Sequence, residues 1–256
     1  MKDRVFPLEG VHNFRRFGGF DTAGKAKVSD RLYRSGQFSR ATGKDRETLA
    51  GLGVRLVADL RRPRERQAEP SFWGEHTGVR VLESDHAGHD EAPHLVFLRE
   101  SDLSLDSIRE FMIETYRRLP FDAGNKWVFE QGLRHLAEAG PEDGFVVHCA
   151  AGKDRTGLFC ALLLTELGVE QETVRADYLF TNEAVDFDRI VPAMTRRIET
   201  EMGRSIGTDE LRAFLGVDAA YLDAAMDAIG EPREYLRGEL GLEESVLDAL
   251  KERLLA

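Results

Sequence analysis

The chain has 256 residues, of which 42% are hydrophobic and 32% charged, a composition that fits a globular protein of one large domain or two small ones. Its formal net charge of −11 argues against nucleic acid as a partner, because phosphate backbones attract clustered positive charge. No apolar run is long enough for a transmembrane helix, the first residues lack the apolar core of a signal peptide, and the two cysteines form no disulfide framework.

Short β-type runs alternate with helical stretches through the first half of the chain. The clearest strand signals lie at 54–60, 79–82 and 145–148, and weaker ones lie at 8–13 and 31–34. Helices are predicted over 42–52, which Thr42 caps, and over 103–119 and 126–139. Strands separated by helices predict an α/β fold with a central sheet of about four to five strands and helices on both faces. A ligand is then expected beyond the carboxyl ends of the strands.

Several histidines and aspartates gather around the strand predicted at 79–82. Such residues are common metal ligands, but no spacing among them matches a known metal motif. The preferred interpretation is therefore a loop of solvated side chains, and no metal or other cofactor is expected. The residues concerned are His76, Asp85, His86, His89, Asp90 and His94.

The most informative stretch runs from Phe145 to Gly157 and reads FVVHCAAGKDRTG, an apolar strand, a loop and the start of an apolar helix. Cys149 and Arg155 are separated by five residues, which is the arrangement of a cysteine-dependent phosphatase. A loop of backbone N–H groups that closes onto a helix N-terminus offers a phosphate dianion a ring of donors and a favourable dipole. The alternative interpretation is a buried structural cysteine beside a solvated turn.

Each position of this loop has an expected role. The backbone N–H groups and the helix dipole that favour a phosphate dianion also favour a thiolate at Cys149. The planar fork of Arg155 can hold two phosphate oxygens. Thr156 can donate its hydroxyl to the sulfur when the sulfur must leave. The expected substrate-binding residues are the loop members and two neighbours, namely His148, Ala150, Ala151, Gly152, Lys153 and Asp59.

A general acid is also needed to protonate the leaving oxygen. Asp154 lies inside the loop, where a second carboxylate beside a bound dianion is easier to protonate, so Asp154 is the predicted acid and base. The alternative is a purely structural role, in which Asp154 forms a salt bridge with a neighbouring arginine. Asp59, at the end of an adjacent strand, is the second candidate, and Asp85 and Asp90 are the third.

No convincing strand follows Gly157. Helices are predicted over 169–181, 184–202, 211–213, 219–229, 234–239 and 244–255. Because no linker or repeat interrupts the chain, residues 1–256 are expected to form one domain with a helical C-terminal half. The segment 182–207 is amphipathic, which is typical of a surface helix with one face on the core, or alternatively of a lid over the site whose hinges or ends are Pro192, Gly203 and Gly207.

These motifs together resemble the tyrosine-phosphatase-like family of bacteria and fungi over nearly the whole chain. One departure is Arg16, where this family often has an acidic residue. The resemblance implies a protein-tyrosine-phosphatase-like fold, hydrolysis through a phosphocysteine without a metal, substrates that sometimes include phosphoinositides and phosphoserine, and a helical lid from the 182–207 region. The segments that carry it are residues 13–15, 17–19, 32–36, 59–61 with Glu65, 148–157, 177–182, 215–217 and 221–222.

The expected function is therefore phosphomonoester hydrolysis, with phosphotyrosine proteins or other phosphomonoesters as partners. Phosphoinositide hydrolysis is the alternative, because residues 150–153 resemble the loop of lipid phosphatases, in which the lysine helps to neutralise a second phosphate; Lys153 can otherwise be a rim charge. A non-catalytic phosphate-binding module is a further alternative.

Cys149 and Cys160 are too far apart to form a disulfide. Because the nucleophile must stay reduced, the expected location is a reducing compartment, the cytoplasm, and non-classical secretion is left open.

Overall fold

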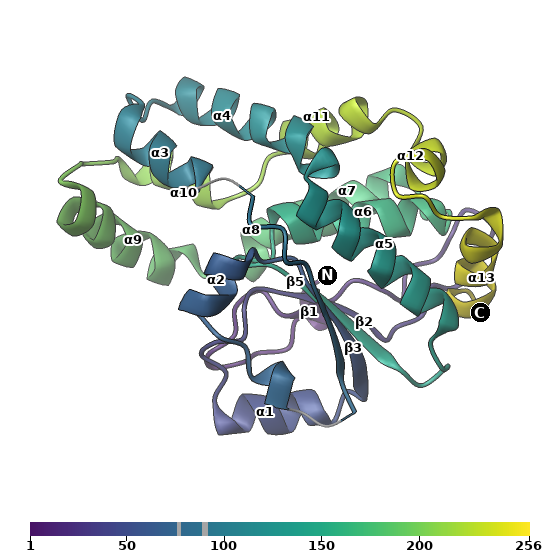
Figure 1. The fold of residues 1–256 in the computed structure, drawn as a ribbon. Helices are drawn as coiled ribbons and strands as arrows, with labels where there is room; N and C mark the ends of the chain where they lie inside the picture. Colours follow the sequence, from purple (N-terminus) through teal and green to yellow (C-terminus); the bar gives the residue numbers. More distant parts are fainter. Residues whose placement is uncertain (76–77, 89–91) are drawn as a thin grey trace.

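A computed structural model of the chain describes residues 1–75, 78–88 and 92–256. Within these residues a five-stranded sheet has the order β1–β2–β5–β3–β4 (Figure 1). The first strand pairs antiparallel with its neighbour and the other pairs are parallel. The strands are β1 Arg15–Arg16, β2 Leu32–Ser35, β3 Val54–Asp59, β4 Arg80–Glu83 and β5 Gly144–His148.

This sheet confirms the predicted α/β class, and four of its strands lie where the sequence indicated them. The strand predicted at 8–13 is wrong. There the amides of Glu9 and Gly10 donate to the carboxylate of Asp45 instead of a neighbouring strand, at 2.7 and 2.8 Å, and Asn13 takes a left-handed φ of 61°. The short strand β1 that follows was not predicted.

Alternate residues of the strands face two different cores, as the pleat of a sheet requires. On one face, Leu32, Phe145 and Val147 belong to the larger core, together with residues of most of the later helices. On the other face, Tyr33 and Val146 belong to a smaller core of aromatic and aliphatic side chains near α1. Helices therefore cover both faces, as Figure 1 shows, and the larger core lies on the side of the C-terminal half.

The helices predicted from an apolar periodicity or from a cap are present, with bounds that differ from the prediction by a few residues. The first, α1 Gly43–Ala50, begins with a reciprocal cap in which Thr42 and Asp45 bond each other's backbone amides. The others in this group are α4 Leu105–Arg118, α5 Ala123–Glu138, α6 Asp154–Glu166, α7 Gln171–Leu179, α9 Phe187–Met202, α10 Thr208–Leu215, α11 Ala219–Ile229, α12 Pro232–Gly238 and α13 Glu244–Leu254.

Three short helices were missed. The segment α2 Pro63–Ala68 is polar throughout and so shows no apolar stripe, although Pro63 at its first turn is a helix-start signal. The segment α3 Pro93–Glu100 lies in a region interpreted as a loop, and it also begins with proline. The third is the single turn α8 Thr181–Ala184. In the described part of the chain, no helix is both long and apolar enough to cross a membrane.

The topology brings three loops to one edge of the sheet. His148 at the end of β5 pairs with Ser35 of β2 on one side and with Asp59 of β3 on the other. The segments that follow these three strands therefore begin side by side. This is the edge at which a parallel sheet places its ligands.

Candidate active site

The loop predicted to bind phosphate connects β5 to the buried helix α6. Its Gly152 has a left-handed φ of 69°, and a Cβ there would lie 2.3 Å from the carbonyl oxygen of Ser35, so the position requires glycine. The side chain of Cys149 is 2% exposed, and the amide of Gly152 donates to its Sγ at 3.3 Å. A backbone donor is thus aimed at the sulfur from inside the loop.

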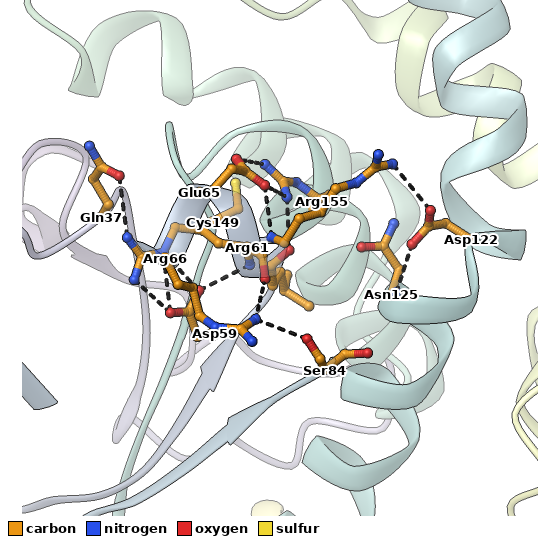
Figure 2. A network of polar contacts seen from close by, with 12 residues as sticks. Gln37, Asp59, Arg61, Glu65, Arg66, Ser84, Asp122, Asn125, Cys149 and Arg155 are labelled. Carbon is orange, nitrogen blue, oxygen red and sulfur yellow. Dashed lines mark hydrogen bonds and ion pairs between the residues drawn. The ribbon is translucent and has the colours of Figure 1, made fainter. Parts of the chain in front are cut away.

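Arg155 lies in the first turn of α6 and is held by Glu65 of α2. Its two Nη atoms donate to the two carboxylate oxygens at 2.7 and 2.8 Å (Figure 2). Nη1 also donates to the carbonyl oxygen of Leu60 at 2.8 Å. These contacts use three of the five guanidinium N–H groups, and the other two lie on the Nε–Nη2 edge. That edge keeps the fork geometry that suits two phosphate oxygens.

The Arg155–Glu65 pair is stable across the ordinary pH range. Burial lowers the pKa of Arg155, but Glu65 outweighs this effect and the pKa lies above its usual value. Burial likewise raises the pKa of Glu65, and the guanidinium outweighs it, so that pKa lies below its usual value. The contribution of the pair is therefore complete above the ordinary glutamate pKa and is lost as the pH falls through the lowered one.

Glu65 is the main site residue to which the sequence analysis assigned no chemical role. The sequence analysis named it only among the segments that carry the family resemblance. A local signal was nevertheless present, because Glu65 is the third residue of a helix that begins at Pro63, and its carboxylate accepts the amide of Arg62 at 2.8 Å. Since α2 follows β3, this cap lies at the edge of the sheet that also carries the loop.

Asp59 lies next to the loop, as predicted, but it is buried and already paired. Its carboxylate accepts from Nε and Nη2 of Arg61 at 2.9 and 2.7 Å, and His148 Nε2 lies 3.6 Å away. Burial lowers the pKa of His148, which favours the uncharged ring, whereas Arg61 stays charged and is the stronger counterion of Asp59. Burial raises the pKa of Asp59, but these neighbours bring it below its usual value. Asp59 is thus linked to the loop through His148, whose Nδ1 lies 3.4 Å from the carbonyl oxygen of Cys149.

Asp154 and Lys153 lie at the start of α6 and contact each other. Lys153 Nζ donates to Asp154 Oδ1 at 2.9 Å and to the carbonyl oxygens of Phe214 and Gly216, both at 3.2 Å. The hydroxyl of Tyr116 also donates to Asp154 Oδ1, at 2.7 Å. The charge partner of Asp154 is therefore Lys153, and not a neighbouring arginine as the structural alternative proposed. The side chain of Lys153 is directed toward the end of α10.

Other predicted residues differ in how closely they approach the sulfur. Ala150 and Ala151 form the exposed rim of the loop beside Cys149. The hydroxyl of Thr156 is buried and has no hydrogen-bond partner among the described residues, so its expected bond to the sulfur is not made here. Asp85, a third-ranked acid, is exposed and lies 3.6 Å from Arg66.

The histidine-rich segment is only partly described. His86 Nδ1 lies 2.9 Å from the hydroxyl of Ser84, and the exposed ring of His94 on α3 is within electrostatic reach of Glu65 and Arg155. Among residues 1–75, 78–88 and 92–256, no group of three or more potential ligands gathers as a metal site would require. His76, His89 and Asp90 lie outside the described residues.

The segment 182–207 consists mainly of α9. Its apolar stripe, which includes Val191 and Ile198, is buried in the larger core, and Pro192 lies inside the helix. Gly203 ends the helix with a left-handed φ of 64°, and Gly207 is the cap of α10. The lid role stays a prediction, which the rate of peroxide inactivation of Cys149 after deletion of 186–202 would test.

Comparison with known proteins gives matches that cover most of this chain. The tyrosine phosphatase family matches residues 6–256 of the chain. The chain is 33% identical over 279 residues to the triple specificity protein phosphatase PtpB of Mycobacterium tuberculosis, covering 98% of this chain and 99% of that protein. It is 28% identical over 235 residues to a tyrosine-protein phosphatase of Nostoc commune, covering 88% of this chain and 74% of that protein. The family match includes every residue of the site described above.

Proposed function

The chain belongs to the tyrosine phosphatase family, and from this premise we propose that Cys149, Arg155 and Asp154 carry out the hydrolysis of phosphotyrosine and other accessible phosphomonoesters. The protein is a phosphoric monoester hydrolase with the α/β fold of that family. The observation that carries the assignment of residues is the loop itself. One segment presents a cysteine sulfur with an amide aimed at it, a helix N-terminus, and a guanidinium with one edge that no hydrogen bond among the described residues occupies.

The proposed reaction has two steps. The thiolate of Cys149 attacks phosphorus and the bond to the leaving oxygen breaks, while Asp154 gives that oxygen a proton. Water then attacks the phosphocysteine, Asp154 takes the proton of the water, and the sulfur–phosphorus bond breaks to release phosphate and the thiolate. The loop amides and Arg155 stabilise the equatorial oxygens as their charge redistributes in both steps.

Asp154 is the proposed acid because it is the carboxylate that lies in the loop and keeps an exposed surface, with 25% of its side chain accessible. Tyr116 and Lys153 fix its position through Oδ1, which leaves Oδ2 to approach the leaving oxygen. Asp59 suits this role less well, because its buried carboxylate is bound through both oxygens by Arg61.

The Asp154→Asn variant is expected to lose about 10² or more in kcat, because general acid catalysis contributes at least that much. The limb of the pH–rate profile that reports the protonated acid should disappear. The loss should be larger for phosphoserine, whose alkoxide is a poor leaving group, than for para-nitrophenyl phosphate. The Asp59→Asn variant should keep the limb and lose stability instead, since a buried ion pair is broken. Loss of the limb in the Asp59 variant alone would assign the acid to Asp59.

We propose phosphotyrosine proteins as the main substrates, with a breadth that the name of the triple specificity relative suggests. The contacts of Lys153 bear on the phosphoinositide alternative. Its ammonium is shared between Asp154 and two carbonyl oxygens, and its side chain is 10% exposed, so a second phosphate would have to displace these partners.

Side-by-side rates on phosphotyrosine peptide, phosphoserine peptide and a soluble phosphoinositide test this proposal. Phosphotyrosine is expected to be the fastest, and Lys153→Met should change the ratio between the substrates little. A preference for the phosphoinositide that Lys153→Met removes would instead establish a lipid phosphatase. Failure of the reduced protein to hydrolyse any of them while still binding phosphate would indicate a binding module.

We further propose a reducing compartment such as the cytoplasm as the site of action. Cys149 and Cys160 are both free, and the thiolate mechanism requires Cys149 to remain so.

A further inference from the structure

Three consecutive carbonyls of the phosphate loop, those of Ala150, Ala151 and Gly152, are bonded by donors from outside the loop. The oxygen of Ala150 accepts the amide of Gln37 at 3.0 Å. The oxygen of Ala151 accepts from Asn13 Nδ2 at 3.1 Å. The oxygen of Gly152 accepts from both Asn13 Nδ2 at 2.9 Å and Arg34 Nη2 at 3.1 Å.

This arrangement matters because the N–H and C=O of one peptide point in opposite directions. Where the carbonyl points outward, the amide of the same peptide unit points inward, toward the position of a bound anion. A carbonyl turned inward would instead place an oxygen against the phosphate dianion. A buried carbonyl that loses its donors costs roughly 1–3 kcal/mol, so the external donors determine which way these peptides face.

The donors themselves are fixed by a buried network. Asn13 is 4% exposed, has a left-handed φ of 61°, and accepts Arg15 Nη1 at its Oδ1. Because a guanidinium can only donate, this contact obliges the NH₂ group of Asn13 to face the loop. Arg34 is fully buried, and its other Nη donates to Asp177 Oδ2 at 2.6 Å.

We propose that Asn13 and Arg34 are positioning residues of the phosphatase, which hold the peptides of Ala151 and Gly152 so that the loop presents amides to the phosphate. The proposal rests on the phosphatase function of the loop and adds two residues that touch no reacting atom. It also assigns a role to the buried charges of Arg15, Arg34 and Asp177. Two arginines and one aspartate carry a net positive charge, and this charge lies next to the anion site.

The test uses two variants of Asn13 that remove the donors in different ways. Asn13→Asp keeps the shape, tolerates the left-handed backbone and still accepts from Arg15, but it cannot donate to the loop. Asn13→Gly removes the side chain and keeps the backbone conformation without strain. The matched control is Asn125→Asp, since Asn125 is also 4% exposed and its Nδ2 donates to a carbonyl outside the loop, that of Leu119, at 2.9 Å.

Inhibition constants for inorganic phosphate, kcat and KM for para-nitrophenyl phosphate, and melting temperatures are measured for all variants. Both Asn13 variants are expected to weaken phosphate inhibition by about tenfold, the effect of about 1.4 kcal/mol, and to raise KM. The pH–rate limbs should stay unchanged, because the nucleophile and the acid are untouched. Asn125→Asp is expected to lower the melting temperature without changing the phosphate constant.

Phosphate constants within twofold of the wild type in folded Asn13 variants would overturn the proposal. If one variant does not fold, the other still decides, because they disturb Arg15 differently. If the wild-type protein binds phosphate but is inactive, the proposed phosphatase function is refuted. The positioning role of Asn13 is then tested by the phosphate affinity of the variants alone.

Discussion

The Cys149→Ser variant is expected to lose at least about 10⁴-fold in turnover of para-nitrophenyl phosphate, because a serine hydroxyl is not ionised near neutral pH and no side-chain base among the described residues bonds the atom at this position. Phosphate binding should survive. The loop backbone and Arg155, which make the proposed contacts to phosphate, are unchanged by the substitution. Turnover is measured on reduced protein, and phosphate binding is measured by the rise in melting temperature with phosphate concentration.

Cys160→Ser is the matched control, since it makes the same substitution at a cysteine on α6 that is 1% exposed. Burial raises the pKa of the Cys160 thiol to about 12, so this group remains protonated and should not affect the rate. Turnover in Cys149→Ser that stays within about a hundredfold of the wild type would refute the covalent mechanism. Loss of phosphate binding together with turnover would favour a structural role for Cys149.

The Arg155→Lys variant is expected to lose about 10²–10³ in kcat/KM, which is the usual cost of removing one donor from a charge-stabilising site. Lysine keeps the positive charge but has no planar fork, so it cannot bond both oxygens of Glu65 and two phosphate oxygens together. Steady-state kinetics and phosphate inhibition constants measure the effect.

The Glu65→Gln variant tests how much the activity depends on the Glu65 carboxylate that holds the guanidinium of Arg155. This variant leaves the guanidinium in place with a neutral partner, so we expect a smaller loss, of about tenfold, that appears mainly as misplacement of Arg155. A lysine variant that retains activity within fivefold of the wild type would show that a point charge is sufficient. A glutamine variant as impaired as the lysine variant would show that the charge of Glu65 matters more than the fork.

The sequence was most informative where function depends on consecutive residues. A strand, a loop and a helix follow each other between Phe145 and Glu166, so the positions of Cys149 and Arg155 followed from local geometry alone. The same reasoning placed Asp59 at the correct edge of the sheet, because parallel strands end together. It could not reveal that Arg61 already occupies both oxygens of that carboxylate, since side-chain direction depends on packing.

The contacts that the sequence left hidden join distant segments. Lys153 reaches carbonyls at 214 and 216, and Asn13 reaches the loop from the other end of the chain. Neither contact produces a periodic pattern or a spacing rule. The helix α3 was hidden for another reason, because it has only eight residues and follows a polar stretch that is typical of a loop, even though Pro93 is a helix-start signal.

The separation of Asn13 and Arg34 from the loop also has a consequence for the order of folding. Their bonds to Gly152 join residues 139 and 118 positions apart, and we expect contacts between such distant residues to form late, because a long loop must close before they can form. During synthesis the N-terminal segment is complete long before its partner leaves the ribosome. The Cys149–Arg155 segment alone therefore carries the reactive groups without the donors that orient its peptides, and a nascent or truncated chain gains its anion site only when its two distant parts dock.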